Sequence, residues 1–200
     1  IAPPLKTQPV TVYLDADGNA SVTAAQINFG SSDNCGIASY SLSKTEFDCS
    51  NVGLNTVTLT VKDINNNIAT GTAIVTVIDN TNPQITCTGN INLIASGANG
   101  ATASFALPVV TDNCSTTLTQ TAGLASGSTF PIGTTTVSYE AVDASGNKAT
   151  CSFNVTVVGV APVLSAPANI TVSNAPGVCG ANVSYAATET TVGIPASTIT

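Results

Sequence analysis

The chain has 200 residues, of which 8% are charged and 43% hydrophobic, and its formal net charge is −7. An acidic chain with so few charges is a poor partner for nucleic acid or for an anionic membrane surface. No apolar run approaches the roughly 20 residues that a membrane-spanning helix needs, so no membrane span is expected.

Turn-forming segments divide the chain into short runs in which apolar and polar residues alternate. Val57, Leu59 and Val61 share one face of such a run, and residues 134–143 show the same pattern. A period of two predicts strands with one buried face, and six or seven of them per 80 residues predict an all-β protein built from β-sandwich domains. In chain order, the turn segments are DADGN (15–19), KDINNN (62–67), SGANG (96–100), FPIG (130–133) and DASGN (143–147).

The pattern repeats with a period of about 80 residues. Val57 and Asp63 correspond to Val137 and Asp143, and the Asp-Asn-Cys of 33–35 returns at 112–114. An internal repeat of this length indicates tandem domains. We therefore predict repeat one over 1–81, repeat two over 82–160 and the N-terminal part of a third repeat over 161–200. The chain starts and stops within this pattern, so we expect it to be a fragment of a longer protein.

Six cysteines in a chain with few charges and no His predict an exported protein in an oxidising compartment. Cys87 and Cys151 open the first and last strands of repeat two, whereas repeat one has Thr7 and Gly71 at the corresponding positions. Because both cysteines are missing together, we predict a Cys87–Cys151 disulfide.

The other four cysteines leave alternatives open. Cys35 and Cys49 are the pair within repeat one, and we predict a disulfide between them unless the intervening strand holds them apart. Cys114 and Cys179 remain, and we predict that they are unpaired or paired outside the chain, or that Cys179 pairs across repeats. A reactive thiol would need a base, and the chain has no His to provide one.

Three segments resemble a known family. They are SGSTFPIGTTTVSYEAVDASGNKATCSFNVTV (126–157), similar to the HYR (hyalin repeat) domain, PANITVSNAPGVCGANVSY (167–185), similar to the start of its bacterial form, and residues 11–49, similar to a sister repeat often found beside it. The resemblance implies tandem immunoglobulin-like β-sandwich domains. It also implies a large cell-surface adhesin of gliding Bacteroidetes, exported by the type IX system.

Oxygen-bearing side chains cluster in several of the predicted turns. Calcium binds six to eight oxygens from carboxylates, amides and carbonyls. We expect the loops of repeat two and the linker to meet, which would form a calcium site between repeats one and two. The alternative is that Asp, Asn and Gly are simply good turn formers. The candidate ligands are Asp15, Asp17, Asp79, Asn80, Asp112, Asn113, Asp143 and Asn147.

These observations predict non-enzymatic spacer repeats of an extracellular, cell-surface adhesin, forming a rod that presents an adhesive region in attachment or gliding. The expected partners are neighbouring repeats of the same chain, and an external surface or polysaccharide contacted through other regions. One alternative is a carbohydrate- or surface-binding module, although 4% aromatic residues favour a spacer. The other alternative is an accessory domain of a secreted enzyme.

Overall fold

The computed structural model describes residues 1–174, 176–191 and 193–196. Strands dominate this part of the chain, which confirms the predicted all-β class. Its two short helical elements are α1 (Ala24–Ile27) and the 3-10 helix η1 (Cys49–Asn51). Among the described residues, no helix has the length and apolar character needed to cross a membrane.

The chain forms two compact units, each assembled from separate stretches of sequence. The first unit contains Ile1–Thr86, Val109–Thr119 and Tyr139–Cys151, and the second contains Cys87–Pro108, Gln120–Ser138 and the residues from Ser152 onward. Two loop regions of the predicted repeat two thus belong to the same compact unit as repeat one. The repeat boundaries at 81 and 160 stay predictions.

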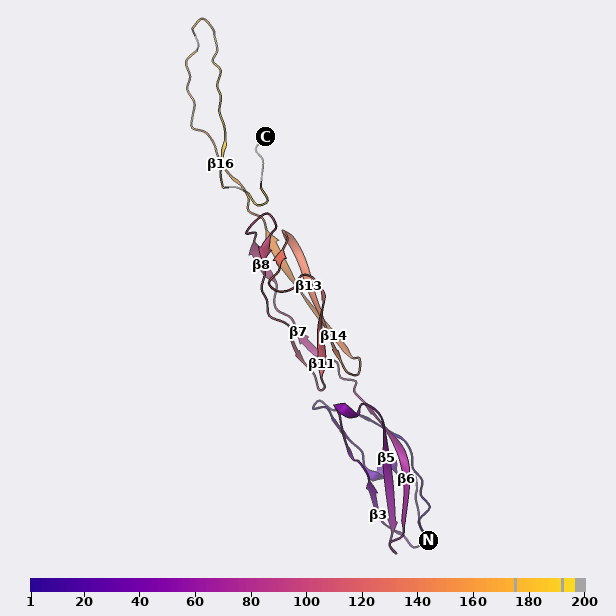
Figure 1. Cartoon of the computed structure of the whole chain (residues 1–200). Coiled ribbons are helices and arrows are strands. Elements are labelled where there is room, and N and C mark those ends of the chain that lie inside the picture. Colours follow the sequence, from indigo (N-terminus) through magenta and orange to yellow (C-terminus); the bar gives the residue numbers. More distant parts are fainter. Residues whose placement is uncertain (175, 192, 197–200) are drawn as a thin grey trace. The chain divides into compact units, whose positions relative to one another are not determined.

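A four-stranded sheet forms the larger layer of the first unit. Its long hairpin pairs β5 (Gly53–Asp63) with β6 (Ile68–Ile78) in antiparallel register, from Gly53 opposite Val77 to Lys62 opposite Ile68. β3 (Ile37–Leu42) lies antiparallel beside β5, and β1 (Val10–Tyr13) lies parallel beside β6, which gives the order β1-β6-β5-β3. β3, β5 and β6 are labelled in Figure 1.

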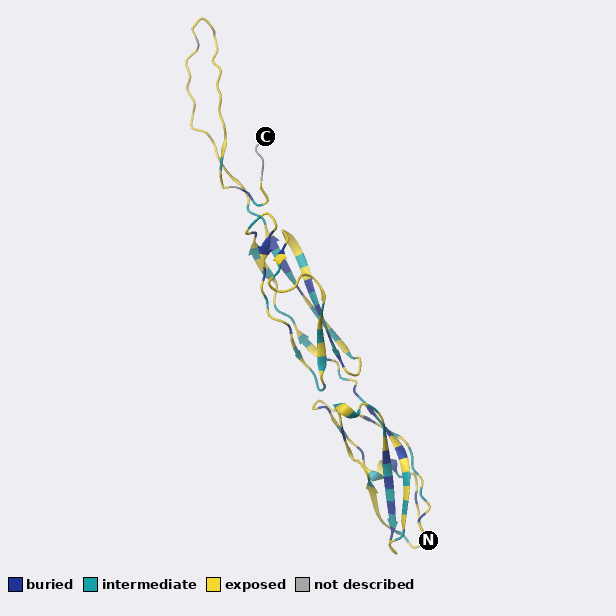
Figure 2. Ribbon diagram, in the orientation of Figure 1, coloured by how far each residue is buried: buried dark blue, intermediate teal, exposed yellow. Residues whose placement is uncertain are grey.

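The core of the first unit lies between this sheet and a smaller layer. Along β5, the buried positions Val57, Leu59 and Val61 alternate with more exposed ones, as predicted (Figure 2). The smaller layer pairs β2 (Asn19–Ser21) with β4 (Glu46–Asp48), and Phe47 of β4 belongs to the same apolar cluster as the β5 side chains. Burial of these side chains stabilises the unit by roughly 1.5–3 kcal/mol each.

Two further strands complete the first unit near its acidic loops. β7 (Gln84–Thr86) pairs antiparallel with β10 (Val109–Thr111), so that Ile85 lies opposite Val110. β7 follows the linker that leaves β6, and β10 leads directly into Asp112. The pairing therefore brings the linker and the Asp112 loop to neighbouring strands.

Repeat two contributes a second four-stranded sheet, and three phenylalanines of the second unit pack together. β8 (Ile91–Ile94) is parallel to β14 (Lys148–Val158), beginning with Ile91 opposite Val155, in a sheet of order β11-β13-β14-β8. The Phe105 ring contacts the rings of Phe130 and Phe153 edge-on, at 6.2 and 5.0 Å between centroids. The remaining strands of these sheets are β9 (Ala101–Thr102), β11 (Thr116–Ala122), β12 (Thr129–Phe130) and β13 (Gly133–Asp143).

The C-terminal part of the second unit contains one small sheet. β15 (Val163–Ser165) pairs antiparallel with β16 (Thr188–Thr191). The side chains of 161–174 are exposed. The structure describes no closed core in 161–174, 176–191 and 193–196, so the third repeat stays a prediction.

The predicted Cys35–Cys49 disulfide is wrong. Cys49 is bonded to Cys114, and Cys35 is free and exposed. The reason is the length of β5. Cys35 lies just before β3, whose first residue is paired with Asp63 at the C-terminal end of β5. Cys49 lies just before Gly53, at the N-terminal end of β5. The ten steps between Gly53 and Asp63, at about 3.3 Å each, place these two ends about 33 Å apart. The two cysteines therefore lie near opposite ends of β5, too far apart to form a disulfide.

The prediction that Cys114 is unpaired or paired outside the chain is also wrong, because its partner lies in repeat one. Cys87 and Cys151 are each disulfide-bonded. Cys179 is free and exposed within this chain.

Candidate metal centre

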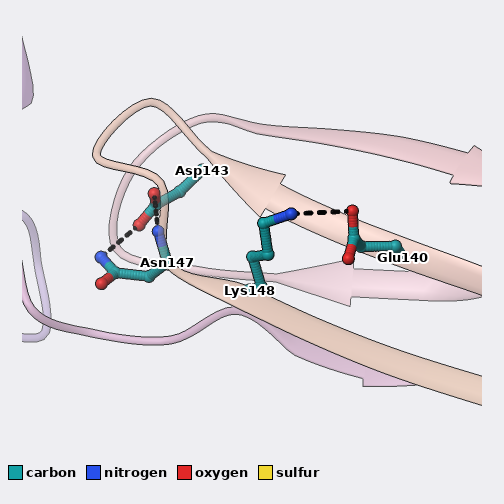
Figure 3. A network of polar contacts seen from close by, with 4 residues as sticks. All are labelled: Glu140, Asp143, Asn147 and Lys148. Atoms are coloured by element: carbon teal, nitrogen blue, oxygen red, sulfur yellow. Dashed lines mark hydrogen bonds and ion pairs between the residues drawn. The ribbon is translucent and has the colours of Figure 1, made fainter.

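The turn after β13 holds Asp143 in a fixed position. One carboxylate oxygen accepts hydrogen bonds from the backbone N–H groups of Ser145 and Asn147, both at 2.8 Å. The other accepts from the Asn147 side chain at 2.7 Å (Figure 3). Lys148, the next residue, is paired with Glu140 at 3.2 Å instead of with Asp143. Asp143 is 6% exposed, and its carboxylate is held by neutral donors.

Asp79 follows β6 and is 5% exposed. Its Oδ1 accepts hydrogen bonds from the Thr81 backbone at 3.1 Å and from the Asn113 side chain at 3.2 Å. Its backbone carbonyl accepts from the Asn147 side chain at 3.2 Å. Its Oδ2 is buried and has no hydrogen-bond partner. Such an atom is unusual, because buried polar atoms are nearly always hydrogen-bonded.

Asp112 and Asn113 contribute two more buried oxygens. Asp112 Oδ2 accepts a hydrogen bond from the Cys114 backbone at 3.3 Å, but its Oδ1 has no partner, and neither does Asn113 Oδ1. Burial raises the pKa of Asp112 above its ordinary value, and the charges of Asp143 and Asp79 raise it further. The electrostatic potential at this carboxylate is therefore negative, and a negative potential attracts a cation.

The three carboxylates form one group. One oxygen from each of Asp79, Asp112 and Asp143 lies within 4.8 Å of the other two. Two ligands on opposite sides of a calcium ion are about 4.6–5.2 Å apart, since each lies about 2.3–2.6 Å from the ion. The spacing, the oxygen-only donor set and the three oxygens without partners all fit a calcium ion. Softer metals would favour the thiolate or imidazole ligands that this group lacks.

Not all of the predicted ligands join this group. The structure places Asp79, Asp112, Asn113, Asp143 and Asn147 together, with Asn147 acting as a donor that positions its neighbours. The other three predicted ligands, Asp15, Asp17 and Asn80, are exposed and lie outside the carboxylate group.

Asp15 has a different role from the one predicted. Its Oδ1 accepts hydrogen bonds from the backbone N–H groups of Asp17 and Asn19 within its own turn, at 3.0 and 2.9 Å. Its backbone carbonyl accepts from the Asn113 side chain at 3.1 Å. The first turn of repeat one therefore orients Asn113 through its backbone and leaves its carboxylates outside the cluster.

The disulfide between Cys49 and Cys114 joins η1 of repeat one to the residue directly after Asn113, with 5.7 Å between the Cα atoms. Gly18, with φ +77°, lies against both loops, since a Cβ there would be 2.6 Å from the Asn113 carbonyl oxygen and 2.9 Å from Cys49 Sγ. Cys49 Sγ itself lies 3.4 Å from the same oxygen, as a van der Waals contact because a disulfide sulfur carries no hydrogen. Sequence reasoning missed both the bond and the role of Gly18.

A hollow of about 290 Å³ opens beside the carboxylates. Residues from repeat one, from the linker, from the strand pair β7–β10 and from the loop after β10 line it. They are Ala16, Thr81, Asn82, Gln84, Thr111, Asp112 and Asn113.

Comparison with known protein families identifies the domain type of one segment of the chain. Residues 78–157 match the HYR domain, so this segment is an HYR-like domain. A hyalin of Strongylocentrotus purpuratus is 41% identical over 148 residues, and a hyalin of Lytechinus variegatus is 36% identical over 143 residues. These alignments include 70% and 67% of this chain but only 12% and 27% of the two hyalins, so the chain spans a small part of these curated relatives.

Solved structures of cadherin repeats are distantly similar. Mouse cadherin-23 EC22-24 aligns with 82% of this chain and 69% of its own, at 13% identity and a TM-score of 0.39. Human CDH23 EC21-23 aligns with 96% of this chain and 80% of its own, at 15% identity and a TM-score of 0.38. At TM-scores this low, the fold assignment rests on the strands and sheets described above.

Proposed function

We propose that repeats one and two are non-enzymatic structural repeats of an extracellular adhesion protein, and that calcium and a disulfide together fix the end of repeat one to the loops of repeat two. The observation that carries this proposal is the Cys49–Cys114 disulfide beside three clustered carboxylates. A disulfide of this kind suits an oxidising, extracellular compartment. The HYR-like segment and its hyalin relatives support an adhesion protein.

The structural role proposed for these repeats is that of a spacer. Tandem repeats add length at a nearly constant stability per repeat, and fixed junctions between them would make a rod. Such a rod would present an adhesive region elsewhere in the protein to an external surface or polysaccharide. The resemblance of 11–49 and 167–185 to bacterial repeats extends the proposal to attachment or gliding by a Bacteroidetes cell.

The calcium part of the proposal follows from charge and from hydrogen-bond accounting. Asp79, Asp112 and Asp143 are close and largely buried, and two of them have an oxygen without a hydrogen-bond partner. Without a cation their mutual repulsion destabilises the fold, since like charges in a site of low dielectric repel strongly. A calcium ion would reverse that repulsion and use the free oxygens as ligands.

Thermal unfolding of the whole chain in calcium and in chelator tests this proposal. A ligand at 100 times its Kd stabilises the folded state by about 2.7 kcal/mol. For a chain of this length that corresponds to a rise in Tm of roughly 5–10 °C. Equilibrium dialysis with calcium should find one bound ion per chain that is lost in the Asp112→Asn variant.

The sign of the Asp112→Asn effect is the sharpest part of this test. In chelator the variant should be at least as stable as the parent, because it removes one buried charge from a repelling group. In calcium it should be less stable, because it removes a ligand. Asp33→Asn changes the corresponding residue of repeat one and should leave the calcium shift intact. Equal Tm values of the parent in calcium and in chelator would refute the calcium site.

A further inference from the structure

The loop Asp33-Asn34-Cys35 of repeat one has the same local structure as the loop Asp112-Asn113-Cys114 of repeat two. In each, the Asp carboxylate accepts a hydrogen bond from the backbone N–H of the Cys two residues later, at 2.8 Å in repeat one and 3.3 Å in repeat two. The two loops therefore present their cysteines from the same kind of turn.

The turn beside this loop is duplicated as well. Asp63 accepts hydrogen bonds from the backbones of Asn65 and Asn67 at 2.8 Å and from the Asn67 side chain at 2.7 Å, the same three distances as in the Asp143 turn. The Ile64 N–H donates to the Gly36 carbonyl at 3.2 Å, so this turn lies against the Cys35 loop. Repeat one thus carries both loops that repeat two uses at its bonded end.

Each of the two repeats also has a hollow beside its Asp-Asn-Cys loop, and the two hollows have nearly the same volume. In repeat one it measures about 300 Å³, against about 290 Å³ in repeat two. Residues 1, 2 and 4 line it where 81, 82 and 84 line the other, and 32–34 line it where 111–113 do. The difference is Ala16, which lines the hollow of repeat two from the preceding repeat. Ile1 and Ala2 therefore line the hollow of repeat one from the position that linker residues 81 and 82 hold at the other hollow.

Cys114 is bonded to the preceding repeat, whereas Cys35 is free and exposed. We propose that the face around Cys35 docks a further repeat of the repeat-one type, joined to the chain ahead of Ile1, and that a cysteine at the place of Cys49 in that repeat forms a disulfide with Cys35. The two thiols lose their hydrogens as the S–S bond forms, and a disulfide such as oxidised glutathione accepts the two electrons and two protons to become two thiols.

The other repeats that could dock on the face around Cys35 lack a free cysteine at the required position. A second copy of this chain has its Cys49 already bonded to Cys114. Repeat two has Thr129 where repeat one has Cys49. The partner must therefore be another repeat that ends as repeat one does, with a cysteine beside a glycine turn like that of Gly18.

The test uses the full chain with a second copy of residues 1–80, itself carrying Cys35→Ser, fused ahead of Ile1. The fusion places an additional Cys49 before the single remaining Cys35 with the natural linker spacing. The protein is oxidised with glutathione in chelator, alkylated, and mapped by mass spectrometry of its peptides without reduction. Because the proposal rests on the disulfide that joins the repeats and not on calcium, the chelator keeps its outcome separate from that of the calcium site.

The expected result is one additional disulfide, between the added Cys49 and Cys35, with Cys49–Cys114 retained. Cys35, which the parent chain leaves open to alkylation, should lose at least nine-tenths of its reactivity. In a Cys35→Ser fusion the added Cys49 should stay reactive, and in a Cys179→Ser fusion the new bond should form unchanged. Alkylation of Cys35 at the parent rate overturns the proposal. Bonding of the added Cys49 to another cysteine would also overturn it. The same holds if the fusion misfolds while its Cys35→Ser form folds.

Discussion

The turns that contain Asp63 and Asp143 have the same hydrogen bonds and different surroundings. In each, the Asp accepts from the backbone two and four residues later and from an Asn side chain. Among the described residues, Asp143 belongs to a group with Asp79 and Asp112 whose carboxylate oxygens lie within 4.8 Å of one another, and no such group contains Asp63. Local sequence thus determines the turn, whereas the neighbouring repeat determines whether the turn becomes part of a candidate metal site.

The largest expected effect comes from removing the disulfide that brings the two repeats together at this turn. Cys49→Ser with Cys114→Ser opens a loop of 65 residues in sequence separation. The chain-entropy model predicts a loss of about 4 kcal/mol in the free energy of unfolding. Denaturant unfolding of the oxidised parent and the double variant measures it.

The control for this experiment is Cys35→Ser with Cys179→Ser, which changes the two free cysteines. It should stay within about 0.5 kcal/mol of the parent, as surface substitutions usually do. A loss as large as that of the first double variant would contradict the role of the Cys49–Cys114 bond.

Gly18→Ala is expected to have the next largest effect, because the new Cβ meets the Asn113 carbonyl oxygen. The matched control is Gly30→Ala, which has nearly the same backbone, φ +75° against +77°, and open space around the new Cβ. The positive φ alone destabilises by about 1–2 kcal/mol. The clash should add at least about 1 kcal/mol at Gly18, as overpacking typically does. Equal losses in the two variants, measured by thermal unfolding, would show that Gly18 does not lie against the Asn113 loop.

Asp63→Asn and Asp143→Asn sharpen the comparison between the two turns. Both remove the carboxylate that accepts from the Asn side chain, and both should lower Tm. In chelator Asp143→Asn should lower it less, because it also removes a charge that faces Asp79 and Asp112. In calcium the order should reverse, with more than half of the calcium-dependent rise in Tm lost. If Asp63→Asn abolishes the calcium effect instead, the site has been assigned to the wrong turn.

The smallest expected effect is a difference in pH dependence. The Asn67 side chain, more than any other group, lowers the pKa of Asp63 below its ordinary value of 3.8. A lowered pKa gives stability that is present above pH 3.8 and is lost as the pH falls through the folded-state pKa. Asn67→Ala should move this acid-side loss toward higher pH. Thermal unfolding in chelator between pH 2 and 5 measures the change, and an unshifted profile would contradict it.

Asp112 should show the opposite dependence in chelator. Its pKa is raised above 3.8, so its stabilising contribution is present below pH 3.8 and is lost as the pH rises through the folded-state pKa. Asp112→Asn should remove that loss from the profile between pH 4 and 7. A profile that stays the same would mean that neither burial nor the charges of Asp143 and Asp79 raise the pKa of Asp112.

Much of the fold could be predicted from the sequence, because alternation and repetition are local signals. The alternation at Val57, Leu59 and Val61 predicted a buried strand face, and these residues are at most 1% exposed. The grouping of Asp79, Asp112 and Asp143 was also expected, because the loops at one end of a sandwich meet the linker. The calcium itself stays a prediction.

What the sequence did not show depended on strand length and on contacts between repeats. Pairing cysteines within a repeat assigned Cys35 to Cys49, whereas β5 separates them and the bond runs to Cys114 of the next repeat. A signal was present: Cys35 and Cys114 are equivalent by repetition, while Cys49 has no counterpart at Thr129. The roles of Gly18 and of the Asp15 carbonyl depend on close approach in three dimensions, which no local pattern records.

The Cys49–Cys114 bond has a mechanical consequence. A pulling force that enters repeat one and leaves through repeat two passes from Cys49 directly to Cys114 through the sulfur atoms. The β5–β6 hairpin, the Asp79 linker and β7 to β10 lie on the segment that this bond bypasses. Reduction of the bond would place the β5–β6 hairpin and the Asp79 linker directly on the path of the force. The redox state of one bond thus decides which strands of repeat one must resist a pull along the chain.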